Sequence, residues 1–193
     1  MTLNTAGNRE SNTNRAILQA NDIALADGLS HGDTNAATGL FNLYFERLFS
    51  MVFYSVGKDR ETAEDITQDT FISALQAAKK YRGNSSVYTW LVGIANHKIA
   101  DYYRRLTKER KYINNTFSPP TAEPQNFDDI VDRALETLPY QYRQVLILKY
   151  VEDMRVAEIA YVMNKTEKSV EALLMRGRKA LKENVQTARD KTK

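Results

Sequence analysis

The apolar residues of this chain recur at every third or fourth position along most of its length, a spacing that predicts α-helices. A first apolar pattern begins at Ile23 and is broken at His31-Gly32-Asp33. A long helix follows, which we expect to end near Gly57. Its large apolar positions are Leu40, Phe41, Tyr44, Phe45, Leu48, Phe49, Val52 and Phe53. Such a density of large side chains predicts a helix that packs in the core.

The next predicted helix runs from about Glu61 to Ala78 and combines a buried stripe with an acidic face. The stripe consists of Ala63, Ile66, Thr70, Phe71, Ala74, Leu75 and Ala78. The acidic face, called the acidic ridge below, consists of Glu61, Glu64, Asp65, Gln68 and Asp69. No Lys or Arg occurs in this helix, so the ridge has no local cation. The spacing alone favours a solvated face over a docking surface for a basic partner.

Cations and aromatic residues are interleaved in the stretch that follows. The cations are Lys79, Lys80 and Arg82, the rings are Tyr81, Tyr88 and Trp90, and a Gly83-Asn84-Ser85-Ser86 turn lies among them. Positive charge beside rings on a flexible loop suits single-stranded nucleic acid, because the rings stack on bases. The alternative is that the rings belong to the core and only the charges are exposed. The core is the expected place of Trp90, since apolar residues follow it at helical spacing.

A further helix is expected to begin near Thr89, which can cap it. Its apolar positions are Leu91, Ile94, Ala95 and Ile99, and its far end carries Lys98, Tyr102, Arg104 and Arg105. Asp101 is expected to pair with Arg104 or Arg105 on the helix surface.

These residues resemble a known family. The segments AEDITQDTF, TWLVGIAN and IADYYRR, in this order, resemble region 2 of bacterial RNA polymerase sigma factors of the extracytoplasmic-function (ECF) group of the sigma-70 family. The Asp65-Ile66-Thr67-Gln68 core and the Thr89-Trp90-Leu91 start are specific in combination. The resemblance implies that the acidic ridge binds the polymerase. It also implies that the promoter −10 element is bound by Lys80, Arg82, Asn84, Ser85, Tyr88, Lys98, Tyr102, Arg104 and Arg105.

A proline-rich stretch divides the chain. Three of its four prolines lie between Ser118 and Pro124. This composition disfavours helices, so residues 108–127 are predicted to be an interdomain linker.

Beyond the linker, the pattern predicts four more helices and a helix-turn-helix. Apolar positions fall at 130–138, 142–150, 156–163 and 170–181, with a turn at Val151-Glu152-Asp153 and another at Asn164-Lys165. Asn164 can take the left-handed conformation, and Thr166 can cap the last helix. Two short helices joined by a tight turn, the second one basic, are typical of DNA-binding proteins, although a plain helical bundle with a solvated basic face is the alternative.

This second block resembles sigma region 4, through Leu138-Pro139, Arg143, Leu148, Glu158-Ile159-Ala160 and Val170. The Asn164-Lys165 turn and the Glu171-Ala172-Leu173 trio depart from the family pattern. The residues expected to bind the −35 element are Thr166, Lys168, Ser169, Glu171, Ala172, Arg176, Arg178 and Lys179. Among them, Arg176, Arg178 and Lys179 are expected on phosphates rather than bases.

The predicted fold is therefore all-α, with two small helical domains joined by a flexible linker. We expect a disordered amino-terminal tail over 1–21, region 2 over 22–107, the linker over 108–127, region 4 over 128–185 and a polar tail over 186–193. The resemblance implies a transcription initiation factor whose partners are core RNA polymerase, through its β′ coiled coil and β flap, promoter DNA and an anti-sigma factor. No cofactor, metal or catalytic residue is expected.

Composition changes this picture little. The chain has 193 residues and a net charge of only +3, so its basic character is a matter of location. It has no cysteine, which suits a reducing cytoplasm, and neither a signal peptide nor a membrane span is expected.

Two other function classes compete with the sigma factor. A stand-alone helix-turn-helix regulator would bind DNA without polymerase, but it leaves the acidic ridge and the aromatic loop without a role. A nuclease with a metal on Asp65 and Asp69 is disfavoured, because neither His31 nor His97 has a partner at a ligand spacing and no Gly-rich phosphate loop occurs.

Overall fold

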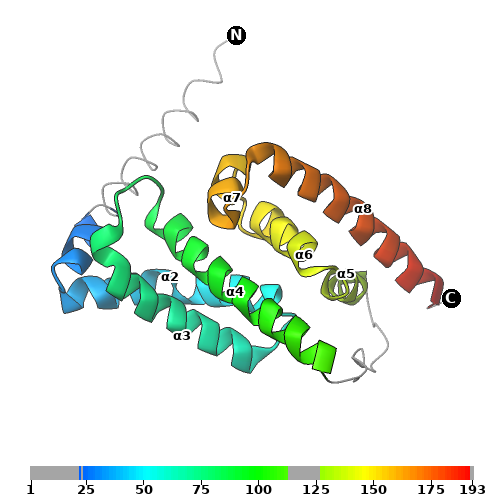
Figure 1. The fold of residues 1–193 in the computed structure, drawn as a ribbon, viewed down its shortest axis with the longest axis horizontal. Helices are drawn as coiled ribbons and strands as arrows, with labels where there is room; N and C mark the ends of the chain where they lie inside the picture. The colour runs from blue at the N-terminus through cyan, green and yellow to red at the C-terminus, as the bar shows by residue number, and fades with distance from the viewer. Residues whose placement is uncertain (1–21, 23, 113–126, 192–193) are drawn as a thin grey trace, which may run out of the picture.

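The chain folds into helices that form two halves packed against each other. A computed structural model describes residues 22, 24–112 and 127–191, of which 109–112, 127, 128 and 191 are described in their backbone only. The first half contains a helical stretch over 24–30, then α2 (Thr34–Ser55), α3 (Arg60–Ala77), a short 3₁₀ turn η1 (Ala78–Lys80) and α4 (Val87–Tyr112). The second half contains α5 (Phe127–Glu136), α6 (Tyr140–Leu146), η2 (Ile147–Val151), α7 (Val156–Met163) and α8 (Glu167–Lys191). Figure 1 shows α4 between α3 and the second half.

Acidic caps begin the two helices that carry the first half. The Asp33 side chain accepts the Asn35 N–H at 2.8 Å at the start of α2, and the Asp59 side chain accepts the Thr62 N–H at 3.2 Å at the start of α3. Each cap satisfies an N–H group that has no acceptor within the helix. Between these helices, Gly57 has φ +77°, a left-handed conformation that glycine adopts without strain. The predicted end of α2 near this glycine is confirmed.

One hydrophobic core runs through both halves. Its fully buried large side chains include Leu40, Leu48, Met51, Leu91, Ile99, Ile147, Leu148 and Ile159. The predicted stripe of α3 is buried except for Leu75, which is 44% exposed, so that part of the prediction is wrong. Thr67 is buried in the stripe as well, because its hydroxyl donates to the Ala63 carbonyl and leaves no unpaired polar group.

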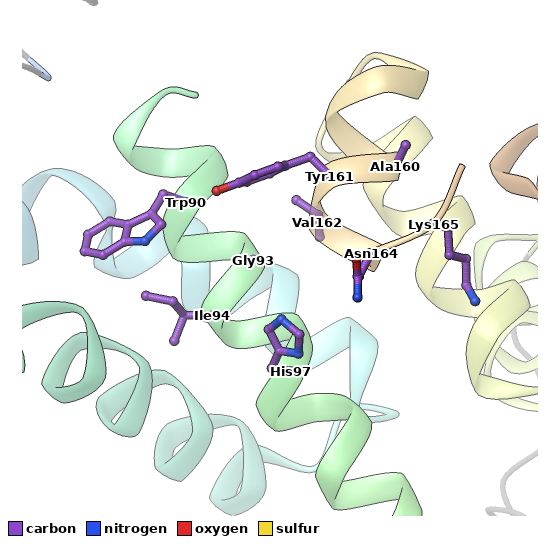
Figure 2. Close-up of a pocket in the computed structure, with 9 residues that line it drawn as sticks. All are labelled: Trp90, Gly93, Ile94, His97, Ala160, Tyr161, Val162, Asn164 and Lys165. Carbon is purple, nitrogen blue, oxygen red and sulfur yellow. The ribbon is translucent and has the colours of Figure 1, made fainter. Parts of the chain in front are cut away.

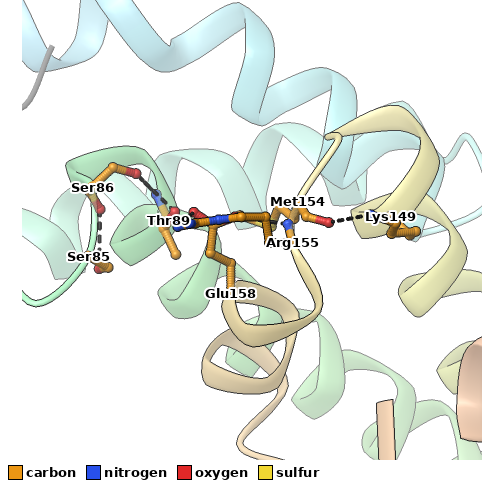
Figure 3. A network of polar contacts seen from close by, with 7 residues as sticks. All are labelled: Ser85, Ser86, Thr89, Lys149, Met154, Arg155 and Glu158. Atoms are coloured by element: carbon orange, nitrogen blue, oxygen red, sulfur yellow. Dashed lines mark hydrogen bonds and ion pairs between the residues drawn. The ribbon is translucent and has the colours of Figure 1, made fainter. Parts of the chain in front are cut away.

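Helix α4 begins earlier than the sequence predicted. Ser86, and not Thr89, is the cap: Ser86 Oγ accepts the Thr89 N–H at 3.0 Å, and the two hydroxyl groups lie 2.9 Å apart (Figure 3). Either residue type can cap a helix, so the sequence pattern alone did not separate them. At its other end α4 continues to Tyr112, past the predicted start of the linker. The proline-rich part of that linker lies outside the described residues.

The predicted helix-turn-helix is confirmed as α7, a tight turn and α8. Asn164 takes the left-handed conformation with φ 50° and ψ 52°, as predicted. Thr166 Oγ1 accepts the Ser169 N–H at 3.2 Å and thereby caps α8. At the start of α7, the Glu158 carboxylate accepts the Arg155 N–H at 2.9 Å and pairs with its guanidinium at 3.0 Å (Figure 3). Helix α8 continues through most of the predicted polar tail.

The segment predicted as a Val151-Glu152-Asp153 turn is more compact than expected. Residues Ile147–Val151 form a π-helical turn, and Asp153 has φ +52°. Glu152 is 6% exposed, although a charged residue in a turn is expected in solvent.

None of the helices within 22–112 and 127–191 has both the length and the apolar character needed to cross a membrane.

We expect Leu148→Ala to lower the free energy of unfolding by about 2–5 kcal/mol, because Leu148 is fully buried and its removal leaves a cavity. Since the core is continuous across both halves, urea denaturation followed by circular dichroism should show one transition at a lower midpoint. Leu43→Ala is the matched control, because Leu43 is 61% exposed, and it should change the free energy by less than about 0.5 kcal/mol. Equal midpoints for the two variants would contradict the core described here.

Candidate functional site

The acidic ridge lies on the exposed face of α3, as predicted. Glu61, Asp65, Gln68 and Asp69 are exposed and Glu64 is half-buried. A groove runs along the ridge toward the far end of α4, and its wall on that side includes Tyr102, Arg105 and Leu106. The ridge is therefore a surface that a partner can reach.

The negative charge of the acidic ridge is partly neutralised by two cations, although the sequence predicted a ridge without a local cation. Arg60 Nε lies 2.8 Å from Glu64 Oε1, and Lys98 Nζ on α4 lies 3.7 Å from Asp69 Oδ2. The sequence could not show the second pair, because Lys98 is brought to α3 only by the packing of α4. The Asp69 side chain is 68% exposed, and exposed ion pairs contribute at most about 1 kcal/mol. These pairs can therefore be exchanged for cations of a partner at little cost.

The loop between η1 and α4, residues 81–86, presents a polar tip on an aromatic base. Arg82, Gly83 and Asn84 are exposed, as is Lys80 before them, and Ser85 is half-buried. The Tyr81 ring packs against the Trp90 ring with centroids 5.1 Å apart. Trp90 is half-buried against the core, in line with the place predicted for it.

Tyr88 does not lie on this loop, and that placement is wrong. It belongs to the first turn of α4 and is 6% exposed. Its hydroxyl donates to Glu152 Oε2 at 2.8 Å, and the Arg47 guanidinium stacks over its ring at 4.0 Å from the centroid. Burial, followed by the negative charge of Glu152, raises the pKa of Tyr88 well above its usual value, so it stays a hydrogen-bond donor.

The far end of α4 carries the predicted basic group. Arg104 and Arg105 are exposed and Tyr102 is half-buried. The predicted pair of Asp101 with an arginine is confirmed, with Arg104 Nη1 at 2.6 Å from Asp101 Oδ1. Lys98 points instead toward the acidic ridge, so the ridge and the basic group are neighbours on one side of the first half.

The predicted recognition residues lie along α8, with its first turns open to solvent. Thr166, Lys168, Ser169, Glu171, Arg176, Arg178 and Lys179 are exposed, whereas Ala172 is half-buried. Arg178 Nη1 donates to the Tyr150 hydroxyl at 3.1 Å, and Lys179 lies 3.9 Å from Glu183. Both contacts are at the surface, so these cations remain available to an anion.

The two halves are joined by a partly buried ionic contact that the sequence did not predict. Arg47 Nε of α2 lies 3.0 Å from Glu152 Oε2, whose side chain is only 4% exposed. The same carboxylate oxygen accepts the Tyr88 hydroxyl, so three residues from distant segments meet at one atom. A buried carboxylate is tolerated only when such partners compensate for its lost hydration. We call this contact the Glu152 clamp.

Further contacts extend the interface on both sides of the clamp. Asn96 Nδ2 of α4 donates to the Val162 carbonyl of α7 at 3.1 Å. The buried Arg143 donates to the Tyr103 hydroxyl at 3.0 Å and to the Ser55 carbonyl at 3.4 Å. Figure 2 shows a pocket between the halves, with Trp90, Gly93, Ile94 and His97 on α4 facing Ala160, Tyr161, Val162, Asn164 and Lys165. The first helix of the helix-turn-helix thus packs on the same helix that carries Tyr88.

No pattern in the sequence indicated that the two halves make contact through Arg47, Glu152 and Asn96. A charged residue in a predicted turn or on a helix surface is usually solvated, and its partner lies across the interface, far away in the chain. In the described part of the chain, no three His, Asp or Glu side chains converge as a metal site would require. The metal arrangement considered for Asp65 and Asp69 therefore finds no third ligand there.

Known families match both halves. The sigma-70 region 2 model matches residues 40–109, and the sigma-70 region 4 model matches residues 128–181. The RNA polymerase sigma factor YlaC of Bacillus subtilis (strain 168) is 29% identical over 161 residues, which cover 78% of this chain and 92% of the relative. The ECF RNA polymerase sigma factor SigX of the same strain is 27% identical over 164 residues, covering 78% and 84%.

A solved structure shares the fold. The sigma factor RpoE from Bartonella quintana, crystallised with the anti-sigma factor NepR, superposes with a TM-score of 0.63 at 19% identity. The match covers 76% of this chain and 94% of that one. At this identity the likeness shows the fold alone.

We expect Glu152→Ala to shift the chain toward a state with separated halves, because it leaves Arg47 and the Tyr88 hydroxyl without their shared partner. The cost comes mainly from the buried Tyr88 hydroxyl left without an acceptor, about 1–3 kcal/mol, because the Arg47 side chain is 54% exposed and can be solvated. Since the chain has no cysteine, Gln76→Cys and Lys182→Cys allow two dyes to be placed on exposed positions of opposite halves. Energy transfer between the dyes should fall in Glu152→Ala and stay unchanged in the control Glu183→Ala. Equal transfer in both variants would rule out the clamp as the contact that holds the halves together.

Proposed function

Because the chain belongs to the ECF group of the sigma-70 family of RNA polymerase sigma factors, we propose that it directs core polymerase to promoters with two separate elements. It reads the −10 element as an opened strand and the −35 element as duplex. The observation that carries this proposal is the pair of exposed surfaces on opposite halves, an acidic ridge on α3 and a basic helix α8, each within its family match.

The acidic ridge is the proposed contact with the polymerase. Asp65, Gln68 and Asp69 are exposed on one face, and the ion pairs that touch this face are weak surface pairs. A basic coiled coil of the β′ subunit would complement it in charge. On the second half, the exposed Tyr150, Val151 and Met175 offer apolar area for a second contact with the β flap.

The loop 81–86 is the proposed reader of the −10 element. Arg82 and Asn84 stand at an exposed tip, and the Tyr81–Trp90 pair beneath them supplies a firm base. Extruding a base costs a few kcal/mol in lost stacking. A preformed pocket and the cations of Lys80, Arg104 and Arg105 offset this cost by binding the base and the strand backbone.

Tyr88 can join this site only when the halves separate. In the closed structure its hydroxyl and ring are covered by Glu152 and Arg47. The proposed order of events is therefore docking through the acidic ridge, separation of the halves on the polymerase, and then capture of the −10 strand. Docking can come first because the ridge is exposed in the closed structure.

The start of α8 is the proposed reader of the −35 element. Lys168, Ser169 and Glu171 are exposed on its first turns, where side chains reach base edges in the major groove. Arg176, Arg178 and Lys179 lie further along and would hold phosphates, which positions the helix without reading sequence. An anti-sigma factor is a further proposed partner, since the fold is shared with a sigma factor solved in such a complex.

Reversing the charge of the ridge should abolish transcription. We expect Asp65→Lys/Asp69→Lys to lower run-off transcription by at least tenfold on a genomic fragment library with purified core polymerase, because lysines on the ridge repel a basic partner. Glu183→Lys/Asp190→Lys changes the net charge equally, on exposed positions of α8, and should leave the transcript pattern in place. Identical patterns with and without the wild-type protein would remove the proposed function.

The isolated protein should bind its promoter poorly. Two weak contacts give useful affinity only when the polymerase fixes their separation, and the closed structure covers Tyr88. Footprinting of a promoter chosen from the library should show protection with core polymerase and none with the protein alone at nanomolar concentration. Specific nanomolar protection of a palindrome without polymerase would instead indicate a stand-alone regulator.

A further inference from the structure

The first turn of α4 is held by a carboxylate from a distant, upstream part of the chain. Asp22 Oδ2 accepts the Val87 N–H at 3.1 Å, and Asp22 Oδ1 accepts the Tyr44 hydroxyl at 3.0 Å. Asp22 is 7% exposed. The first N–H groups of a helix lack intrahelical acceptors and carry partial positive charge, so they stabilise a buried carboxylate at this place.

The loop 81–86 depends on the same turn. Ser86, whose hydroxyl oxygen accepts the Thr89 N–H, directly precedes Val87, whose N–H donates to Asp22. At the other end of the loop, the Tyr81 hydroxyl donates to the Ser85 carbonyl. Burial, and then the charge of Asp22, raise the pKa of Tyr81, so this hydroxyl remains a donor. Both ends of the loop are thus fixed near Asp22, while its tip stays exposed.

Asp22 lies upstream of the region 2 match, which covers residues 40–109. The helical stretch that follows it flanks the loop directly: Ala26 and Ser30 line a groove with Tyr81, Arg82 and Gly83. The carboxylate itself occupies the start of α4, so this helix end is satisfied within the protein and is not open to a phosphate.

We infer that Asp22 is a positioning residue for recognition of the −10 element. It fixes the first turn of α4 and thereby the loop that presents Arg82 and Asn84 to an extruded base. The inference rests on the proposed function of this loop. A loop held in one conformation before binding cannot rearrange to accommodate a different base, so its contacts discriminate more strongly between bases.

The test measures base discrimination rather than activity alone. Run-off transcription with saturating core polymerase is compared on a promoter from the library and on versions with single-base substitutions in the −10 element. We expect Asp22→Ala, which removes both hydrogen bonds to this carboxylate, to lower the ratio of cognate to substituted transcript about tenfold. Tyr44→Phe, which removes only one of the two bonds, should lower it less, and the exposed Glu46→Ala should leave it unchanged.

A merely structural role predicts a different result. A destabilised protein gives less transcript from every template, with the ratio preserved. If Asp22→Ala does not fold, Asp22→Asn takes its place, because it keeps the shape and loses the charge. A preserved ratio in the variant, beside clear discrimination by the wild type, overturns this inference alone. Absence of discrimination by the wild type overturns the proposed reading of the −10 element as well.

Discussion

The relative position of the surfaces on the two halves depends on the buried carboxylate of Glu152. This group lies where α2, α4 and the second half meet, and it is held by the Arg47 guanidinium and the Tyr88 hydroxyl. A carboxylate removed from water is stable only with such partners, so the contact favours one arrangement of the halves. Apolar packing alone would allow the halves to slide, whereas two donors that share one carboxylate oxygen define a single arrangement. Asn96 and Arg143 reinforce that arrangement on either side.

In the closed arrangement, some of the proposed binding surfaces are exposed to solvent and Tyr88 is covered. The acidic ridge faces outward, and so do the first turns of α8. Tyr88, in contrast, is covered by the second half, and α7 packs on α4 through Asn96 and Val162. The proposed polymerase contact is therefore available before the complete proposed DNA contact is. Large complexes can use such an order to prevent premature DNA binding, because the energy needed to separate the halves comes from the docking contacts.

Local features of the fold were predictable from the sequence, and contacts between distant segments were not. The left-handed Asn164, the Thr166 cap and the Asp101–Arg104 pair follow from rules that involve neighbouring residues. Leu75 was misplaced, because a stripe drawn on one helix does not say how far the neighbouring helices reach across it. Glu152, Lys98 and Asp22 have partners 65 or 105 positions away, or on another helix, and no local pattern contains that information. The same reason explains why the pair of Lys98 with Asp69 was not predicted, whereas Arg60 is only four residues from Glu64 and directly precedes the predicted helix.

Helix α4 also fixes the distance between the loop 81–86 and the pair Arg104 and Arg105. It is unbroken from Val87, beside the loop, past Arg104 and Arg105. At about 1.5 Å per residue, the 17 or 18 steps between them span roughly 26 Å, close to the length of eight stacked base pairs. One continuous helix thus fixes the distance between the proposed base-reading loop and the arginines that are proposed to bind the strand backbone. An inserted residue would lengthen the helix only slightly but would turn its far end by about 100°, so the arginines would face away from the strand that they are proposed to bind. The length of DNA between the two proposed contacts is therefore set by the length of one helix.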